Sequence, residues 1–340
     1  MSERLVVLAP NWLGDAVMAL PAIADLRRHY PDAHLGVAAR PAVAPMFTMV
    51  DGIDAVITLP GGGGLRALTG WSEDARALAA EAFDTAVLLP NSFATAFVAS
   101  KAGIRERWGF ATDMRGSMLT RAIAKPQGGL HQRAYYQALT GALGIEAGPP
   151  FARVRPNVER ARQLLRDIGL DLDEPFAVFA PGAAYGRAKQ WLPERFAELA
   201  DQLIHQRGWS VVMVGSGADR SACAEITRRL PQRGHRLNRL IDFCGKSDLA
   251  TLAGVLSQAA AVVSNDSGAM HLAGAVGTKV IAIFGPTREK QTSPLSAGPD
   301  APVPVVITHD VFCRPCMLRE CPIDHRCMRR IPAADVLKAI

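Results

Sequence analysis

The sequence lacks the features of a membrane-spanning or exported protein. Its longest apolar stretches, such as residues 252–263, are interrupted by glycine and polar residues and fall short of the roughly 18 residues that suggest a spanning helix. The apolar run at 5–9 is too short for the core of a signal peptide, and it leads into Asn11 and Asp15 rather than into a cleavage site. We therefore expect a cytoplasmic globular protein without a transmembrane segment.

Long blocks of lysine and arginine are also missing, although the chain carries a formal net charge of +6. Aromatic residues make up only 6% of the chain, and no basic stretch is interleaved with them as in an RNA-binding module. Positive charge that is spread in this way favours an anionic substrate or an anionic membrane surface. We expect no nucleic-acid partner.

Two nucleotide-binding fingerprints are missing as well. No G-x-G-x-x-G follows the first expected strand, and this absence argues against an NAD-dependent dehydrogenase. Residues 61–64 are consecutive glycines, but no Lys-Ser/Thr follows them as in a P-loop, so we expect a plain loop, with a phosphate cradle as the alternative. A two-lobed periplasmic binding protein would need a signal peptide, which is not found.

What the sequence does contain is an alternation of short apolar runs with amphipathic stretches. This alternation predicts βαβ units, parallel sheets and the α/β fold class, and the length of 340 residues favours two domains. The strands expected in the first half are 5–9, 34–39, 55–59 and 85–90, and the helices between them include 16–29 and 74–82. The strands expected in the second half are 176–180, 211–215, 240–244, 261–265, 279–284 and 303–308.

A tract rich in glycine and proline separates the two series of strands. It begins at Gly144, reads "GIEAGPPFARVRPNVERA", and has the composition of a connector until its Arg/Glu-rich helix starts. We expect domains at 1–157 and 158–340, with packing of the C-terminal helix on the first domain as an option. In open α/β domains the loops that follow the strand C-termini bind the ligand, so the functional residues should lie there.

One such loop, "NDSGAMHL", leaves an apolar strand and enters a helix. Unpaired N–H groups and the positive end of the helix dipole suit a diphosphate at that position. Gly268 permits close approach, and His271, about one turn further on, could donate to a phosphate oxygen or a ribose hydroxyl. The alternative is a helix start without function, in which Asp266 or Ser267 is the cap and His271 is packed in the core.

A second loop, "PGAAYGRAKQWLPERF", supplies a cation. Lys189 follows several small or flexible residues, and a helix is expected to start at Pro193. A lysine in such a loop can reach a phosphate, although most lysines are simply exposed surface residues. The large aromatic Trp191 beside it indicates an anchored loop and so favours the phosphate-binding interpretation.

The segments "NWLGDAVMALPA", "PGAAYGRAKQW" and "NDSGAMHLAGA", in this order and spacing, resemble the heptosyltransferases of lipopolysaccharide inner-core assembly, glycosyltransferase family 9. The resemblance covers essentially the whole chain and implies a GT-B fold, in which two Rossmann-like domains face each other across a cleft. It implies inverting transfer of L-glycero-D-manno-heptose from ADP-heptose to a lipid A–core acceptor. The motifs are nearest to the members that act on the first core heptose, with another acceptor as the alternative.

The resemblance implies roles on the acceptor side, in the N-terminal domain. Asp15 matches the family's catalytic base, which takes the proton of the attacking acceptor hydroxyl. The alternative for this carboxylate is a helix cap. Asn11 and Gly14 lie beside it on the acceptor side. Because the acceptor is carried by a lipid, the enzyme is expected at the cytoplasmic face of the inner membrane as a peripheral protein.

The resemblance also implies a donor site in the C-terminal domain. Lys189 is expected to stabilise the charge that develops on the leaving diphosphate, and so to act in catalysis as well as in binding. The donor-binding positions are Lys189, Asp266, Ser267, Gly268 and His271. No metal ligand is assigned and no cofactor is required; the chemistry allows a divalent cation, but no residue pattern indicates one.

Four of the six cysteines lie in "CRPCMLRECPIDHRC", as Cys313, Cys316, Cys321 and Cys327. C-x2-C is a zinc-knuckle spacing, but the second pair is spaced more widely than in the usual structural zinc site. We expect reduced cysteines, with metal binding as the alternative and a disulfide after that. Another family-like segment, "GGLHQRAYYQALTGALG", contains His131 and Tyr135, which we assign only to the rim of the cleft.

Overall fold

The computed structural model describes residues 3–61, 67–231 and 238–340. The chain divides into two compact units, Met1–Ala152 and Arg153–Ile340, and the division lies inside the tract expected to be the connector. Apart from Gly61, the glycine loop expected at 61–64 lies outside the described residues. Within those same residues, no helix combines the length and the apolar character needed to cross a membrane.

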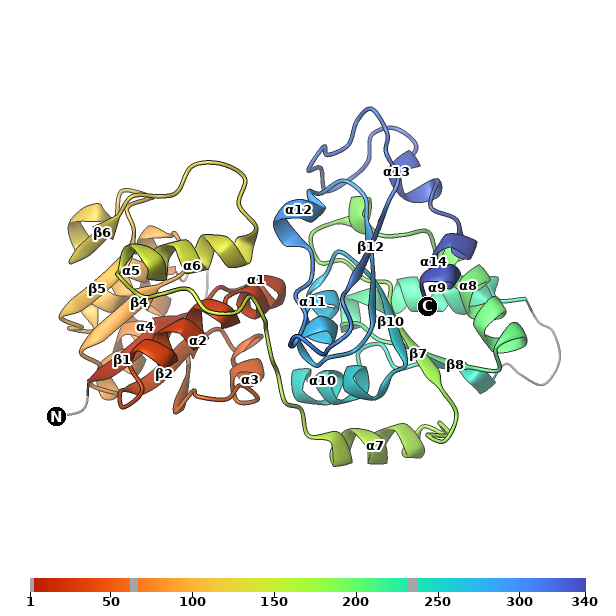
Figure 1. The fold of residues 1–340 in the computed structure, drawn as a ribbon, viewed down its shortest axis with the longest axis horizontal. Coiled ribbons are helices and arrows are strands. Elements are labelled where there is room, and N and C mark those ends of the chain that lie inside the picture. Colours follow the sequence, from red (N-terminus) through yellow and green to blue (C-terminus); the bar gives the residue numbers. More distant parts are fainter. Residues whose placement is uncertain (1–2, 62–66, 232–237) are drawn as a thin grey trace. The chain divides into compact units, whose positions relative to one another are not determined.

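The first unit is built on a six-stranded parallel sheet with the order β3-β2-β1-β4-β5-β6 (Figure 1). From β1 the chain adds β2 and β3 on one side of the sheet and then β4, β5 and β6 on the other, so the switch point lies between β1 and β4. This is the strand order of the Rossmann fold. Its strands are β1 (Arg4–Leu8), β2 (His34–Ala39), β3 (Ala55–Thr58), β4 (Thr85–Leu88), β5 (Glu106–Phe110) and β6 (Arg121–Ile123). Its helices are α1 (Leu13–Met18), α2 (Leu20–His29), α3 (Ala44–Phe47), α4 (Ala67–Ala80), α5 (Phe93–Lys101), the short 3-10 helix η2 (Gly116–Met118) and α6 (Gln132–Ala142).

The second unit repeats this plan with the order β12-β11-β10-β7-β8-β9, and here the reversal lies between β7 and β10. Its strands are β7 (Phe176–Ala180), β8 (Ser210–Met213), β9 (Leu240–Asp242), β10 (Ala261–Asn265), β11 (Val280–Phe284) and β12 (Val305–Thr308). Its α-helices are α7 (Val158–Asp167), α8 (Pro193–Gln206), α9 (Arg220–Arg229), α10 (Leu249–Gln258), α11 (Gly268–Ala275), α12 (Glu289–Thr292), α13 (Arg326–Arg329) and α14 (Ala333–Ala339). Two short 3-10 helices, η3 (Arg187–Lys189) and η4 (Gly217–Asp219), follow β7 and β8.

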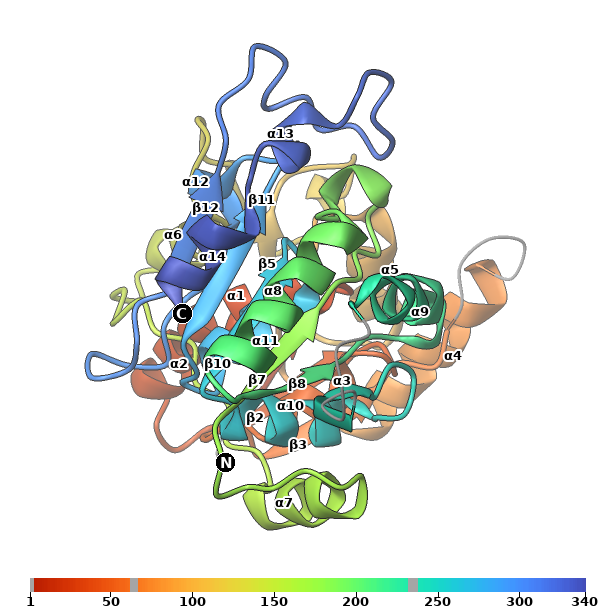
Figure 2. The same cartoon turned by 90° about the vertical axis from the view of Figure 1, so that its right-hand side faces the viewer.

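The central strands of the second sheet are buried at every residue, because helices cover both faces of a parallel sheet. Figure 2 looks onto one of these faces, which α8 crosses, and α14 contacts α8 within the same unit. Apolar side chains of α8, α9 and α14 join those of the strands in one core, in which Trp191 is fully buried. The indole N–H of Trp191 donates to the Ile331 carbonyl at 3.0 Å, which confirms the anchored loop expected after β7.

Two expectations for the first unit are wrong in detail. The single helix expected at 16–29 is two helices, because Ala19 ends α1 and also caps α2, whose first turn contains Pro21 and so lacks one N–H donor. The strands β5 and β6 were not expected at all. Glu106 in β5 and Arg121 in β6 are exposed, and the polar ends of these short strands hide the apolar pattern of a buried strand.

Candidate functional site

The residues expected to act lie at the switch points of the two sheets, where the strand order reverses. In the first unit, the loop after β1 carries Asn11, and the first turn of α1, which follows it, contains Gly14 and Asp15. In the second unit, Lys189 follows β7 and Asp266 follows β10. Open α/β sheets bind their ligands outside the carboxyl ends of the strands at such points. Each unit thus presents one candidate half-site.

Asp15 lies in the first turn of α1 and is partly buried. The N-cap residue of this helix is Trp12, in an extended conformation, so Asp15 occupies a helical position and is not the N-cap. A carboxylate in the first turn is favoured by the positive end of the helix dipole. The short loop and the helix therefore hold the Asp15 carboxylate close to the carboxyl end of β1, with Asn11 exposed before it.

Tyr136, in α6, is a buried neighbour of Asp15, and α6 contacts α1. Burial and then the negative charge of Asp15 hold the pKa of the Tyr136 phenol well above its usual range. The phenol is therefore a neutral hydroxyl at every physiological pH, and Asp15 has a buried, uncharged group on this side. Sequence reasoning assigned no role to Tyr136, since a tyrosine in an amphipathic helix is ordinarily a core residue.

Tyr135 and His131 have local partners in the first unit. The side-chain amide of Asn91, just after β4, donates to the Tyr135 hydroxyl at 2.8 Å. Burial raises the pKa of this phenol, although the Asn91 bond acts in the opposite sense. His131 is the N-cap residue of α6, and its Nδ1 accepts from the backbone N–H of Arg133 at 3.1 Å. Tyr135 thus lies at the carboxyl end of β4, while one ring nitrogen of His131 serves to start the helix.

Arg115 is a buried charge that sequence reasoning missed. Its guanidinium donates to the Phe110 carbonyl and to the Thr95 hydroxyl, both at 3.0 Å, and also to the Pro90 carbonyl. Pro90 and Thr95 follow β4 and Phe110 is the last residue of β5, so Arg115 ties the ends of these two neighbouring strands together. Burial lowers the pKa of the guanidinium. No sequence signal distinguishes this arginine from a surface one, because its partners are backbone carbonyls and a hydroxyl.

In the second unit, Lys189 and Asp266 form an ion pair. The ammonium nitrogen lies 2.6 Å from a carboxylate oxygen, and the side chains are only 14% and 5% exposed. The same oxygen accepts a hydrogen bond from the hydroxyl of Thr287 at 2.7 Å. The ammonium also lies 4.8 Å from the centre of the Tyr185 ring, a favourable cation–π distance. An anion that entered here would compete with Asp266 for Lys189.

The start of α11 lies directly after this carboxylate. Gly268 is its first residue, and Ser267 is its N-cap residue, whose side chain makes no capping hydrogen bond. The Ser267 hydroxyl instead lies 3.1 Å from that of Ser264. His271 is 3% exposed, as the packed-core alternative predicts, and its role in donor binding stays a prediction. The first N–H groups of α11 remain the natural anion-binding feature of this end of the sheet.

Asn265 connects the two loops of the second half-site, and it too was missed. Its side-chain oxygen accepts from the backbone N–H of Trp191 at 2.9 Å, and its amide donates to the Pro181 carbonyl at 2.6 Å. The loop that carries Lys189 is therefore fixed to the end of β10 at both of its ends. Gly182 is packed against the neighbouring loop after β8, where a Cβ atom would overlap the carboxylate of Asp219.

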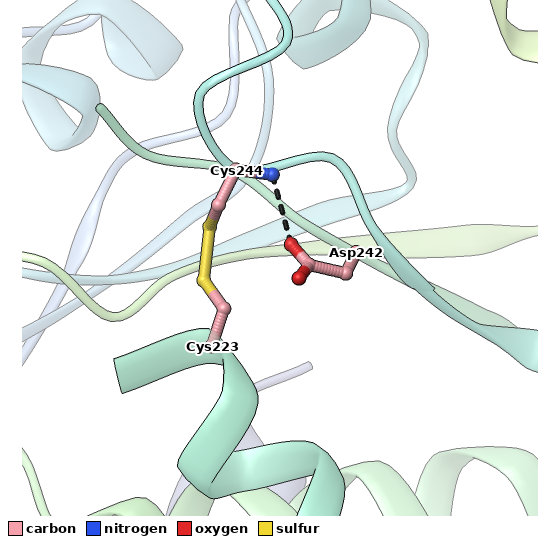
Figure 3. A group of neighbouring side chains, drawn as sticks. All are labelled: Cys223, Asp242 and Cys244. Atoms are coloured by element: carbon pink, nitrogen blue, oxygen red, sulfur yellow. Dashed lines mark hydrogen bonds between the residues drawn. A yellow bond between two sulfur atoms is a disulfide. The ribbon is translucent and has the colours of Figure 1, made fainter. Parts of the chain in front are cut away.

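One compact group of metal-ligand atoms occurs among the described residues, and it is not a metal site. Cys223, Asp242 and Cys244 place their ligand atoms within 4.8 Å of one another (Figure 3). The two sulfurs are joined in a disulfide, and the Asp242 carboxylate accepts from the backbone N–H of Cys244 at 3.0 Å. A disulfide sulfur is not the thiolate that binds metal ions. Sequence reasoning considered only the other cysteines and missed this pair.

Comparisons with known proteins place these half-sites in a family. Residues 72–325 match Glycosyltransferase family 9 (heptosyltransferase). The chain is 32% identical over 308 residues to lipooligosaccharide heptosyltransferase 2 of Haemophilus influenzae, with 86% of each chain covered. It is 30% identical over 302 residues to lipopolysaccharide heptosyltransferase 2 of Escherichia coli, again with 86% of each covered.

The solved structure of Escherichia coli ADP-heptose lipopolysaccharide heptosyltransferase II is similar over 99% of this chain and 97% of that chain, with a TM-score of 0.84 and 26% identity. This similarity confirms the predicted GT-B fold class with its two Rossmann-like units. The family match includes Lys189 and Asp266 but begins after Asp15, so the roles of single residues stay predictions. The chain belongs to glycosyltransferase family 9, the heptosyltransferase family.

Proposed function

We propose that this chain is an inverting heptosyltransferase that moves L-glycero-D-manno-heptose from ADP-heptose to the inner core of lipopolysaccharide, with the first core heptose as acceptor. The observation that carries the proposal is the buried Lys189–Asp266 pair at the start of α11. It combines a cation with unpaired helix N–H groups, which is what a nucleoside diphosphate requires. The choice of the first core heptose as acceptor is supported by the similarity to the heptosyltransferase 2 relatives in Haemophilus influenzae and Escherichia coli.

On the donor side, Lys189 leaves Asp266 and turns to the diphosphate of ADP-heptose. Asp266 keeps its hydrogen bond from Thr287, and a hydroxyl of the bound nucleotide sugar can replace the lysine. As the bond between the anomeric carbon and the diphosphate oxygen breaks, negative charge grows on ADP. Lys189 and the backbone N–H groups near Ser267 and Gly268 stabilise this charge and lower the barrier.

On the acceptor side, Asp15 is the general base. The acceptor hydroxyl oxygen attacks the anomeric carbon from the face opposite ADP, its proton passes to the Asp15 carboxylate, and ADP leaves with the bonding electron pair. The configuration at the anomeric carbon is thereby inverted. Tyr136 stays protonated beside Asp15, so it adds no competing negative charge. Asn11, in the loop before α1, and Gly14, in the first turn of α1, contact the acceptor.

We assign the enzyme to the cytoplasmic face of the inner membrane as a peripheral protein. Large apolar side chains are exposed at the carboxyl edge of the first sheet, where a lipid-borne acceptor would approach. They follow β1, β4, β5 and β6 and are Trp12, Phe93, Met114 and Leu130. Such side chains can enter the lipid headgroup region, and the net charge of +6 adds attraction to anionic lipids.

The direct test is to incubate the purified protein with ADP-heptose and a panel of defined core acceptors and to identify the products by mass. We expect one heptose to be added to an acceptor that already carries the first core heptose. No addition to the acceptor that lacks this sugar should occur. Transfer to the heptose-free acceptor alone would contradict the proposed acceptor, and transfer to none of them would contradict the proposed function.

A further inference from the structure

Four cysteines of one loop surround a small cavity in the second unit. The loop connects β12 with α13 and is the dark blue segment at the top of Figure 1. The thiols of Cys313, Cys316, Cys321 and Cys327 line the cavity together with Arg314 and His325. Its volume is about 20 Å³, which is the space of a single water molecule or ion. Cysteines separated by up to 14 positions in the chain (313 to 327) thus converge on one point.

Hydrogen bonds to neighbouring segments hold this loop, but apolar packing contributes little to it: the Arg314 guanidinium donates to the Gly285 carbonyl at 2.7 Å, and the Met317 N–H donates to the Pro286 carbonyl at 3.0 Å. Several of its large apolar side chains point to solvent rather than into a core: Phe312, Met317, Leu318 and Ile323. Only β12 before it and the one-turn helix α13 after it are regular elements. A segment that cannot bury its own apolar residues is typically stabilised by a disulfide or by a structural metal ion. All four cysteines are free thiols here.

We infer that this loop holds one transition-metal ion, Zn²⁺ or iron, on the four cysteine sulfurs. Four thiolates in a tetrahedron are the donor set that these ions prefer. Among the described residues, no three ligand atoms of this loop lie within 4.8 Å of one another, so an ion would draw the thiols inward.

The site sits against the loop that carries Lys189. The backbone N–H of Ala188 donates to the Arg319 carbonyl at 2.9 Å, and a ring nitrogen of His325 lies 2.8 Å from the Ala188 carbonyl. The Tyr185 hydroxyl donates to the Met317 carbonyl at 2.8 Å. Met317 and Arg319 lie between Cys316 and Cys321, so an ion on those two sulfurs fixes the carbonyls that hold the loop.

Gly186 shows how closely the two loops are packed. A Cβ atom at this position would overlap the backbone of Arg319. A ring nitrogen of His325 is turned toward the Ala188 carbonyl, so His325 links the two loops and is not counted among the metal ligands. The metal ion would therefore position Lys189 without touching substrate. Only this last step rests on the proposed function, since the ion site itself is independent of the reaction.

The first test is the metal content of the protein purified without added metal, measured by mass spectrometry of the elements. We expect about one zinc or iron ion per chain. Cys316→Ser and Cys321→Ser should each lose it, whereas Leu318→Ser, an exposed residue of the same loop, should keep it. Less than about a tenth of an ion per chain, also after incubation with Zn²⁺, would overturn the site. So would unchanged metal content in both cysteine variants.

The second test asks whether the ion orders the neighbouring loop. Hydrogen exchange is followed on the folded full-length chain, without substrate, before and after removal of the ion by a chelator. The Ala188 amide, which donates to Arg319, should exchange faster after removal, whereas amides of β10 should not change. An unchanged Ala188 amide would overturn the positioning role. Neither test uses the transfer reaction, so failure of the proposed function leaves both results interpretable.

Discussion

The two half-sites differ in how firmly their polar groups are held. Lys189 and Asp266 are almost fully buried and bound to each other, and Asn265 fixes both loops around them. Asp15 is only partly buried, and Trp12 beside it is 61% exposed. Fixed loops keep Lys189 within reach of the donor, so that once it has exchanged Asp266 for the diphosphate it needs no further reorganisation when the bond breaks. A base must instead remain accessible to a large acceptor.

Removal of the base should have the largest effect. Asp15→Asn keeps the shape of the side chain but cannot accept the proton, so transfer should fall by about 10²- to 10⁴-fold. Affinity for ADP should stay near that of the wild type, since the proposed donor residues lie in the other unit. Steady-state transfer rates and calorimetric titration with ADP measure the two quantities.

The matched control is Asp32→Asn, which changes an exposed carboxylate of the same unit. It should leave both quantities unchanged. If Asp15→Asn keeps more than about a tenth of the wild-type rate, the assignment of the base is wrong, and the alternative of a purely structural carboxylate gains support.

Removal of the donor lysine should come next. Lys189→Ala deletes the cation and leaves the buried Asp266 carboxylate without its ion pair, although it keeps the hydrogen bond from the Thr287 hydroxyl. We expect ADP affinity to fall roughly 10- to 100-fold, the range of a hydrogen bond to a charged group, and kcat to fall as well because the charge on ADP grows in the transition state. The readouts are KM, kcat and the Kd for ADP.

Lys338→Ala, an exposed lysine of α14, is the control for a general change of charge. A loss confined to KM would mean that Lys189 binds the donor equally in the ground state and the transition state. Loss of neither parameter would remove Lys189 from the site and leave the ion pair with Asp266 as a structural contact.

These two half-sites also show what sequence can and cannot predict. The ranges 34–39, 176–180 and 261–265 coincide with β2, β7 and β10, because buried apolar runs followed by turn residues have few other structures open to them. Lys189 and Asp266 were both expected at the donor site, but their pairing was not. Motif order shows which loops follow which strands, whereas the contact between two loops depends on the sheet that brings them together.

Arg115 and Asn265 were beyond sequence reasoning for a related reason. Their partners are mainly backbone groups of distant segments, as in the bond from Asn265 to Pro181 across 84 positions. A backbone carbonyl has no residue type, so no spacing or motif records the interaction. The four cysteines of the C-terminal loop are an intermediate case: their spacing left several states open, and the shared cavity favours one of them.

Replacement of Arg115 should test whether this buried arginine stabilises the first unit by connecting the ends of β4 and β5. Arg115→Met fills a similar volume but removes the guanidinium donor from the Pro90 carbonyl, whereas the Phe110 carbonyl still accepts from the backbone N–H of Thr112 at 2.9 Å. An unsatisfied buried group costs about 1–3 kcal/mol, so the free energy of unfolding should drop by about that amount. Denaturant unfolding measures it, and Arg107→Met, whose guanidinium also donates to backbone carbonyls but is less buried, should cost less. Equal losses would mean that the greater burial of Arg115 does not increase its contribution to the free energy of unfolding.

The smallest expected effect concerns membrane attachment, for which the two units should again differ. Met114 is 92% exposed at the carboxyl edge of the first sheet, and Val303 is 80% exposed in the second unit. Binding to anionic vesicles should weaken as salt rises, because the Debye length falls from about 10 Å at 0.1 M to about 3 Å at 1 M.

At low salt, Met114→Ser should weaken binding by a few-fold to about tenfold, since a methionine side chain gains about 1.5–3 kcal/mol when fully buried and only part of that at an interface. Val303→Ser should bind as the wild type does. Co-sedimentation with vesicles measures all of this, and equal losses in the two variants would mean that attachment is not confined to the first unit.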